Sequence, residues 1–152
     1  MANPYEDLIR NYERRIRALE ETLTALQMPL LTGTWTDYSG TSTIVGWSSF
    51  TKQDLSYVET PIQGGLNLMF VLVNLVGTSD STSTSFTVPS ANASGIGINC
   101  YMRVQDSGTY QPAGLATIVA ASDVVNVYTD SSAAAWTASG TKSVRGGIWY
   151  VS

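Results

Sequence analysis

Apolar residues recur at alternating spacings of four and three along the first 27 residues of the chain. A repeat of seven residues is typical of a coiled coil, whereas a helix packed on a globular domain follows a period nearer 3.6. Asn3 and Pro4 are typical of a helix start, and Pro29 cannot continue a helix. The sequence therefore predicts a coiled-coil helix over residues 1–28, with these seam residues: Tyr5, Ile9, Tyr12, Ile16, Leu19, Leu23 and Leu26.

The charged residues beside this seam favour a coiled coil of three parallel helices. Arg15 precedes a seam residue and Glu20 follows the next one, so the two side chains would pair between neighbouring helices. The segment Arg15–Glu20 also resembles a trimerisation signature of short parallel coiled coils, and a trimer gives the bulky tyrosines of the seam more room. We therefore expect a homotrimer whose interface includes Arg15 and Glu20. A helix packed on its own chain is the alternative, which the 3.5-residue period disfavours.

Composition changes abruptly near Pro29. Nine of the 20 charged residues lie in residues 1–27, which leaves eleven for the other 125, and residues 32–152 contain 34 serines and threonines. We expect two domains, the coiled-coil segment 1–28 and a β domain over residues 29–152 that begins with a connecting loop at 29–42.

The second segment has the pattern of short strands separated by turn residues. Residues 98–106 alternate between apolar and polar side chains, and Asp106-Ser107-Gly108 is a turn signal. A mainly-β fold of the β-sandwich or jelly-roll type is predicted. The expected strands are Thr43–Phe50, Leu55–Thr60, Leu66–Val76, Ser83–Val88, Ile98–Asp106, Leu115–Ala121, Val124–Thr129 and Val144–Val151.

Composition excludes several classes of function. The chain has no histidine and one cysteine, Cys100, so a Ser-His-Asp triad, a His-ligated zinc and an intrachain disulfide are ruled out. A net charge of −4 argues against a nucleic-acid partner. The longest apolar run, Leu66–Val76, is too short to span a membrane, and no signal peptide is recognisable. We expect no metal, no cofactor and no membrane insertion, and a buried, reduced Cys100.

No residue pattern in the β segment points to catalysis. Its acidic residues lie mostly in predicted turns, where aspartate is favoured for local hydrogen bonds, and no spacing singles out an acid–base pair. We expect no enzyme activity and no catalytic residue. Aromatic residues in or near loops are candidate ligand contacts, with core packing as their alternative role: Trp35, Tyr38, Trp47, Tyr110 and Trp136.

The arrangement of a short trimeric coiled coil before a Ser/Thr-rich, weakly charged β domain resembles bacteriophage virion proteins of the fibre, spike or capsid-decoration type. The resemblance implies a non-enzymatic structural protein, synthesised in the host cytoplasm and located in the virion, with other capsid or tail proteins as partners. Residues 4–28 would form a stalk of only about 37 Å, which favours a capsid decoration or head fibre. A tail-tip receptor-binding protein and a trimeric carbohydrate-binding lectin or adhesin are the alternatives, and a host-surface glycan is a further candidate partner.

The run Leu66–Val76 is apolar on both faces of the expected strand. The opposing sheet of a sandwich covers one face, and a neighbouring subunit would cover the other, because residues 1–28 are already assigned to the stalk. The alternative is that Thr43–Phe50 or Leu55–Thr60 folds over that face within one chain.

Overall fold

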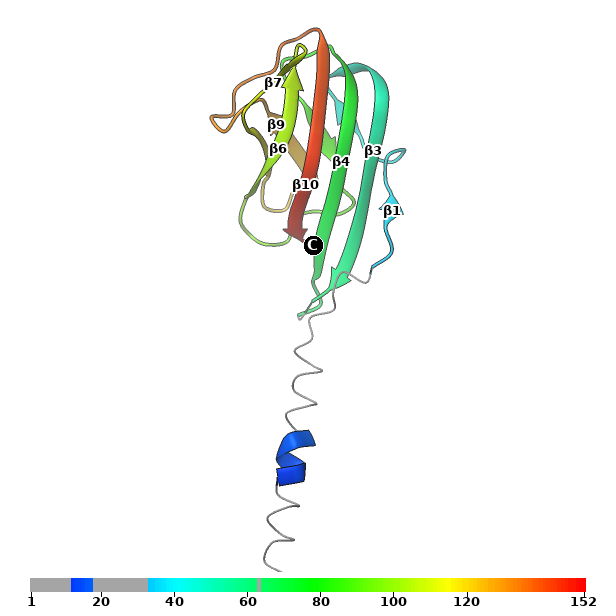
Figure 1. The fold of residues 1–152 in the computed structure, drawn as a ribbon, viewed down its shortest axis with the longest axis vertical. Coiled ribbons are helices and arrows are strands. Elements are labelled where there is room, and N and C mark those ends of the chain that lie inside the picture. The colour runs from blue at the N-terminus through cyan, green and yellow to red at the C-terminus, as the bar shows by residue number, and fades with distance from the viewer. Residues whose placement is uncertain (1–11, 18–32, 63) are drawn as a thin grey trace, which may run out of the picture. The chain divides into compact units, whose positions relative to one another are not determined.

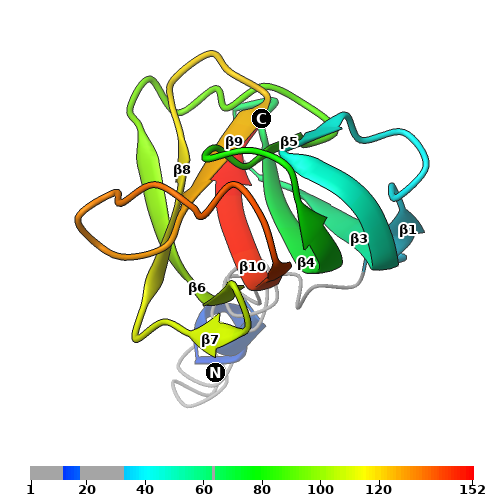
Figure 2. The same ribbon diagram turned by 90° about the horizontal axis from the view of Figure 1, so that it is seen from above.

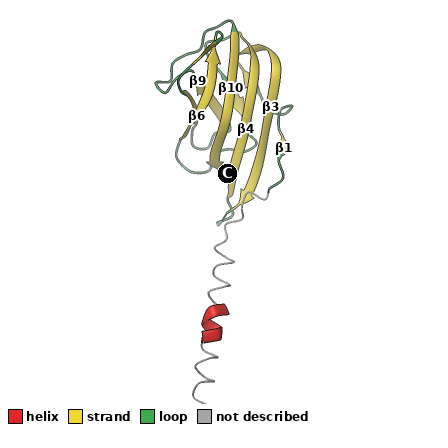
Figure 3. Ribbon diagram, in the orientation of Figure 1, coloured by secondary structure: helices red, strands yellow, loops and turns green. Residues whose placement is uncertain are grey.

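The computed structural model describes residues 12–17, 33–62 and 64–152. The chain divides into two compact units, Met1–Thr32 and Gly33–Ser152. Residues 12–17 are helical, and the second unit consists of β-strands and loops, as Figures 1 and 3 show. The prediction of a mainly-β chain is confirmed.

Ten strands follow one another in the second unit. Their bounds are β1 Thr36–Asp37, β2 Ile44–Val45, β3 Trp47–Pro61, β4 Asn67–Ser79, β5 Ser85–Thr87, β6 Ile98–Asp106, β7 Thr109–Tyr110, β8 Gly114–Ile118, β9 Val124–Tyr128 and β10 Thr141–Val151.

The strands form one curled antiparallel sheet in the order β1-β3-β4-β10-β6-β8-β9-β5-β2, with β7 paired to β6. Strand β6 links the two halves of this order. Its residues 103–105 pair with β10, and its residues 98–102 pair with β8. We call β1, β3, β4, β10 and the second half of β6 sheet A, and β2, β5, β9, β8 and the first half of β6 sheet B. The two halves of the curled sheet are thus joined through a shared strand.

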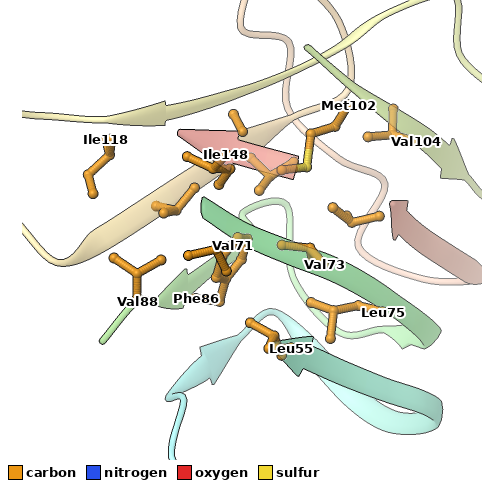
Figure 4. Packing of buried hydrophobic residues seen from close by; sticks show 14 of the residues in the cluster. Leu55, Val71, Val73, Leu75, Phe86, Val88, Met102, Val104, Ile118 and Ile148 are labelled. Atoms are coloured by element: carbon orange, nitrogen blue, oxygen red, sulfur yellow. The ribbon is translucent and has the colours of Figure 1, made fainter. Parts of the chain in front are cut away.

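The hydrophobic core lies between sheets A and B. Every second residue of β4 faces it, including Val71, Val73 and Leu75, and Phe86 and Ile118 reach it from the opposite layer. Figure 4 shows these side chains interdigitating, and Figure 2 shows the two layers facing each other. This burial is the main source of the unit's stability.

Six of the expected strands lie within two to three residues of an observed one, and Ile98–Asp106 coincides with β6. The prediction of two separate strands over Thr43–Phe50 and Leu55–Thr60 is wrong, because it divides the segment at the wrong place. The chain breaks at Gly46 and then continues as the single 15-residue strand β3. Gly46 has a φ of +91°, and a Cβ there would collide with the carbonyl of Ser83, so only glycine fits this break.

Strand β1 lies within the segment expected to be a connecting loop, because Thr36 and Asp37 pair with Tyr57 and Ser56 of β3. Ser107 and Gly108 both have positive φ in the two-residue connection from β6 to β7, as a tight hairpin turn requires. The turn signal at this point is confirmed.

The coiled-coil prediction falls largely outside the described residues. Tyr12, Arg15 and Ile16 lie in the described helix, and the other expected interface residues, Tyr5, Ile9, Leu19, Glu20, Leu23 and Leu26, lie outside the described part of the chain. In the part that is described, no helix is both long and apolar enough to cross a membrane.

Candidate functional site

The outer face of sheet A, which points away from the core, carries large apolar side chains. Strand β4 contributes Leu68, Phe70 and Leu72 to this face, because the alternate residues point inward. Ile148 and Tyr150 of β10 are buried, so Trp149 between them points outward. The two-sided apolar character expected of Leu66–Val76 is therefore confirmed within β4.

Three aromatic rings form a row on this face. The rings of Phe70 and Trp149, which are directly opposite on β4 and β10, stack with their centroids 4.1 Å apart. Trp35 meets Phe70 edge-on at 5.7 Å. Trp35, Leu72 and Trp149 remain 46%, 42% and 44% exposed. Aromatic side chains of this size are the usual anchors of binding surfaces. We call Trp35, Leu68, Phe70, Leu72, Trp149 and Val151 the apolar half of the outer face.

The chain itself covers only the edge of this face. Gly33 packs against Val58 and Glu59 so closely that a Cβ would clash, and Val58 is buried as a result. The predicted alternative, in which Thr43–Phe50 or Leu55–Thr60 folds over the face, is wrong, since residues 47–61 form β3 beside β4 in the same layer. In the described ranges, nothing covers Leu72 or Trp149.

A polar row crosses the same face further along the strands. Asp54, Asn74, Arg145 and Arg103 are successive cross-strand neighbours on β3, β4, β10 and β6. The amide nitrogen of Asn74 donates to the carboxylate of Asp54 at 3.2 Å, and Lys52 pairs with the same carboxylate at 3.1 Å. All of these residues except Arg103 line an open groove of about 640 Å³, together with Ser56, Leu72, Val73 and Gly146.

Two of the five candidate aromatics lie in the core. Trp47 is 8% exposed and Trp136 only 3%, and the indole nitrogen of Trp136 donates to the carbonyl of Val127 at 2.7 Å. Their role as ligand contacts is therefore wrong for this fold, and their alternative role as packing residues describes them. Trp47 begins β3 directly after the break at Gly46, and Trp136 lies in the loop between β9 and β10, so position in or near a loop does not separate exposed from buried rings.

The other three candidates lie apart from one another. Trp35 belongs to the apolar half of the outer face. Tyr110 is exposed on β7, and its ring lies 4.4 Å from the guanidinium of Arg103. Tyr38 is partly buried, packs edge-on against Tyr57 and donates to the carbonyl of Val88 at 3.4 Å. The structure thus retains Trp35 and Tyr110 as surface aromatics, and it adds Trp149, which the sequence analysis placed in a strand but not at a binding surface.

The buried ammonium group of Lys142 lies beside the rings of both core tryptophans. The ammonium of Lys142 is 4.8 Å from the ring of Trp136 and 5.3 Å from that of Trp47. It donates to the carbonyl of Gly46 at 2.9 Å and to the hydroxyl of Thr84 at 2.8 Å. Burial lowers the pKa of Lys142 from 10.5 to about 8, although the acidic groups of Asp106 and Asp80 oppose the shift. The hydrogen bonds of Lys142 thus connect β10 with the segments at Gly46 and Thr84, and its ammonium group is buried.

Other chemistry is sparse in the part of the chain that the structure describes. Cys100 is partly buried rather than fully buried, although it packs on the core as its strand position predicts. Residues 12–17, 33–62 and 64–152 contain no group of three histidine, cysteine or acidic residues placed to hold a metal ion. The outer face of sheet A is accordingly the candidate functional site.

Comparisons with known proteins return no relative. No protein-family model matches the chain, and neither the curated proteins nor the solved structures contain a significant match. The function has to be inferred from the surface itself.

Proposed function

We propose that the chain is a non-enzymatic structural protein of a bacteriophage virion, which forms a short homotrimer on the particle surface as a capsid decoration or head fibre. The observation that carries the proposal is the apolar half of the outer face. Sheet A already packs its inner face against sheet B, so the exposed parts of Trp35 and Trp149, which flank the half-buried Phe70, contribute little to folding one chain. In an assembly of identical subunits, a neighbouring copy of the chain can cover such a face.

The position of this face in the chain supports a threefold contact. Gly33, where the β unit begins, packs on the outer face at Val58. Only seven residue steps separate Gly33 from Leu26, the last residue of the heptad, and seven residues reach at most about 25 Å. A parallel trimer of the heptad segment would therefore raise the effective concentration of the three copies of this face for one another.

The polar and charge balance of the β unit agrees with this arrangement. Residues 33–152 hold eleven of the charged residues, and none of them lies in the apolar half of the outer face. Subunit contacts are depleted in lysine, glutamate and aspartate at their centre. A surface of serine and threonine elsewhere leaves the particle hydrated without attracting nucleic acid.

Light scattering on the purified full chain tests the trimer. Three chains of 16.3 kDa give an expected mass of about 49 kDa. Ile16→Asn places an amide in the seam of every helix and should weaken assembly strongly. Arg17→Asn, one position along and outside the seam, is the matched control and should leave the mass unchanged. A wild-type monomer would contradict the proposal.

Labelling of virus particles tests the location. Antibody-coupled gold against this chain should decorate the capsid of the phage that encodes it. Label confined to the tail tip would instead favour the receptor-binding alternative, and particles without label would exclude a virion role.

A further inference from the structure

The β unit concentrates its exposed positive charge at one place. Residues 33–152 contain four basic and seven acidic residues. Of the four basic residues, Lys142 is buried, and the other three lie on the outer face of sheet A. Lys52 and Arg145 line the groove, and Arg103 is the cross-strand neighbour of Arg145 on β6. In an acidic protein, such an arrangement favours a partner that carries negative charge.

Two of these cations face each other without an acidic partner. Arg103 and Arg145 are directly opposite on β6 and β10, an arrangement that costs free energy for like charges. On this face Lys52 forms an ion pair with Asp54. Neither Arg103 nor Arg145 forms an ion pair with any residue that the structure describes. The ring of Tyr110 lies against the guanidinium of Arg103 and holds it in place. A bound anion would relieve this repulsion.

The groove beside the arginines also has neutral polar groups and an apolar floor. The amide of Asn74 uses its nitrogen on Asp54, and its oxygen is buried without a hydrogen-bond partner in the described structure. Leu72 contributes an apolar surface between the small residues Ser56 and Gly147, which are its direct neighbours on β3 and β10. The carboxylate of Asp54, the hydroxyl of Ser56 and the apolar floor match the hydroxyls and the ring face of a sugar.

We propose that this groove binds an acidic saccharide, with its carboxylate on Arg145 beside the positive charge of Arg103, its hydroxyls on Asp54 and Ser56, and one ring face on Leu72. Guanidinium groups hold carboxylates through paired, charge-assisted hydrogen bonds. A volume of about 640 Å³ suits a ligand of a few rings. The inference rests on the proposed function and deepens it, because it assigns a surface-glycan ligand to the polar row of the outer face, with Leu72 at the boundary between this row and the subunit contact.

Isothermal titration of the full chain with trigalacturonic acid tests the assignment. We expect one site per chain and an affinity that falls as salt is added, since the contact is ionic. The same trisaccharide with methyl-esterified carboxylates is the matched ligand control and should bind at least about tenfold more weakly. Arg145→Ala and Arg103→Ala should each weaken binding about tenfold or more. Arg14→Ala, which removes an exposed guanidinium from the described helix, should leave it unchanged.

Three results would overturn the inference. They are no heat of binding with trigalacturonic acid or with 3′-sialyllactose, equal affinity for the methyl ester, and equal affinity for inorganic phosphate. Light scattering on the same samples separates this inference from the trimer. If Arg145→Ala disassembles the protein, the arginines serve the subunit contact and the ligand assignment is wrong. If the wild-type protein is a monomer that still binds the acid form selectively, the proposed assembly fails while the site stands.

Discussion

The inner and outer faces of sheet A carry similar side chains in different surroundings. On β4, Val71, Val73 and Leu75 of the inner face are almost completely buried against sheet B, whereas Leu72 on the outer face is 42% exposed. The same contrast holds on β10, where Ile148 is buried and Trp149 is exposed. Each of these two strands therefore presents apolar residues both to the buried core and to an exposed outer face.

The difference teaches that apolar side chains in one run can serve two purposes. Burial of the inner residues stabilises the single chain. The outer residues gain little from folding, because they stay exposed, and they become favourable only when a second surface covers them. Substitutions that are matched across the sheet can separate these two contributions.

The largest expected contrast is between two leucines of one strand. Leu75→Ala should lower the free energy of unfolding by about 2–5 kcal/mol, because it opens a cavity in the core. Leu72→Ala should cost far less in the single chain, and its effect should grow with protein concentration because it acts on assembly. Urea unfolding at several concentrations measures both. Equal and concentration-independent losses would mean that the two faces do not differ.

A second contrast compares two tryptophans. Trp136→Phe removes the donor to the carbonyl of Val127 in the core and should cost about 1–3 kcal/mol. Trp149→Phe on the outer face keeps an aromatic ring that can stack on Phe70 and should change the stability of the chain little. Thermal unfolding of both variants checks the difference, and a larger loss for Trp149→Phe would contradict it.

The third contrast concerns two lysines and pH. In the folded state Lys142 has a pKa of about 8, below its ordinary value of 10.5. Between those values the unfolded chain holds more protons, so the free energy of unfolding should rise with pH, by at most about 1.4 kcal/mol per pH unit. Lys142→Met should remove this rise, while Lys52→Met, which changes an exposed lysine, should keep it. Urea unfolding from pH 7.5 to 10.5 measures the slopes, and identical slopes in all three proteins would contradict the burial effect.

Much of the strand content could be predicted from local pattern. The alternation in Ile98–Asp106 and the continuous apolar run in Leu66–Val76 each depend on neighbouring residues, so the sequence contains the signal. The long β3 could not be predicted in the same way. Its polar first half, Ser48 to Asp54, has no apolar period, and its pairing with β4 across irregular registers fixes it as a strand.

The candidate site was less predictable than the fold. Trp35 and Tyr110 were found because they lie near loops, but Trp47 and Trp136 share that property and are buried around Lys142. The groove was missed because Asp54, Asn74 and Arg145 are far apart in the sequence and become neighbours only through the strand register. The signal that could have pointed to it is the scarcity of cations, since two of the four basic residues of the β unit line one groove and a third, Arg103, is the cross-strand neighbour of Arg145.

The central claim is that the apolar half of the outer face forms a subunit contact. Sedimentation equilibrium of the Ile16→Asn variant of the chain tests this claim most directly. With the seam weakened, association must come from the β unit. The account predicts a mass that rises with concentration from 16.3 kDa towards about 49 kDa, and that stays at 16.3 kDa when Leu72→Ser and Trp149→Ser are added. A mass of 16.3 kDa for Ile16→Asn at every concentration would contradict it.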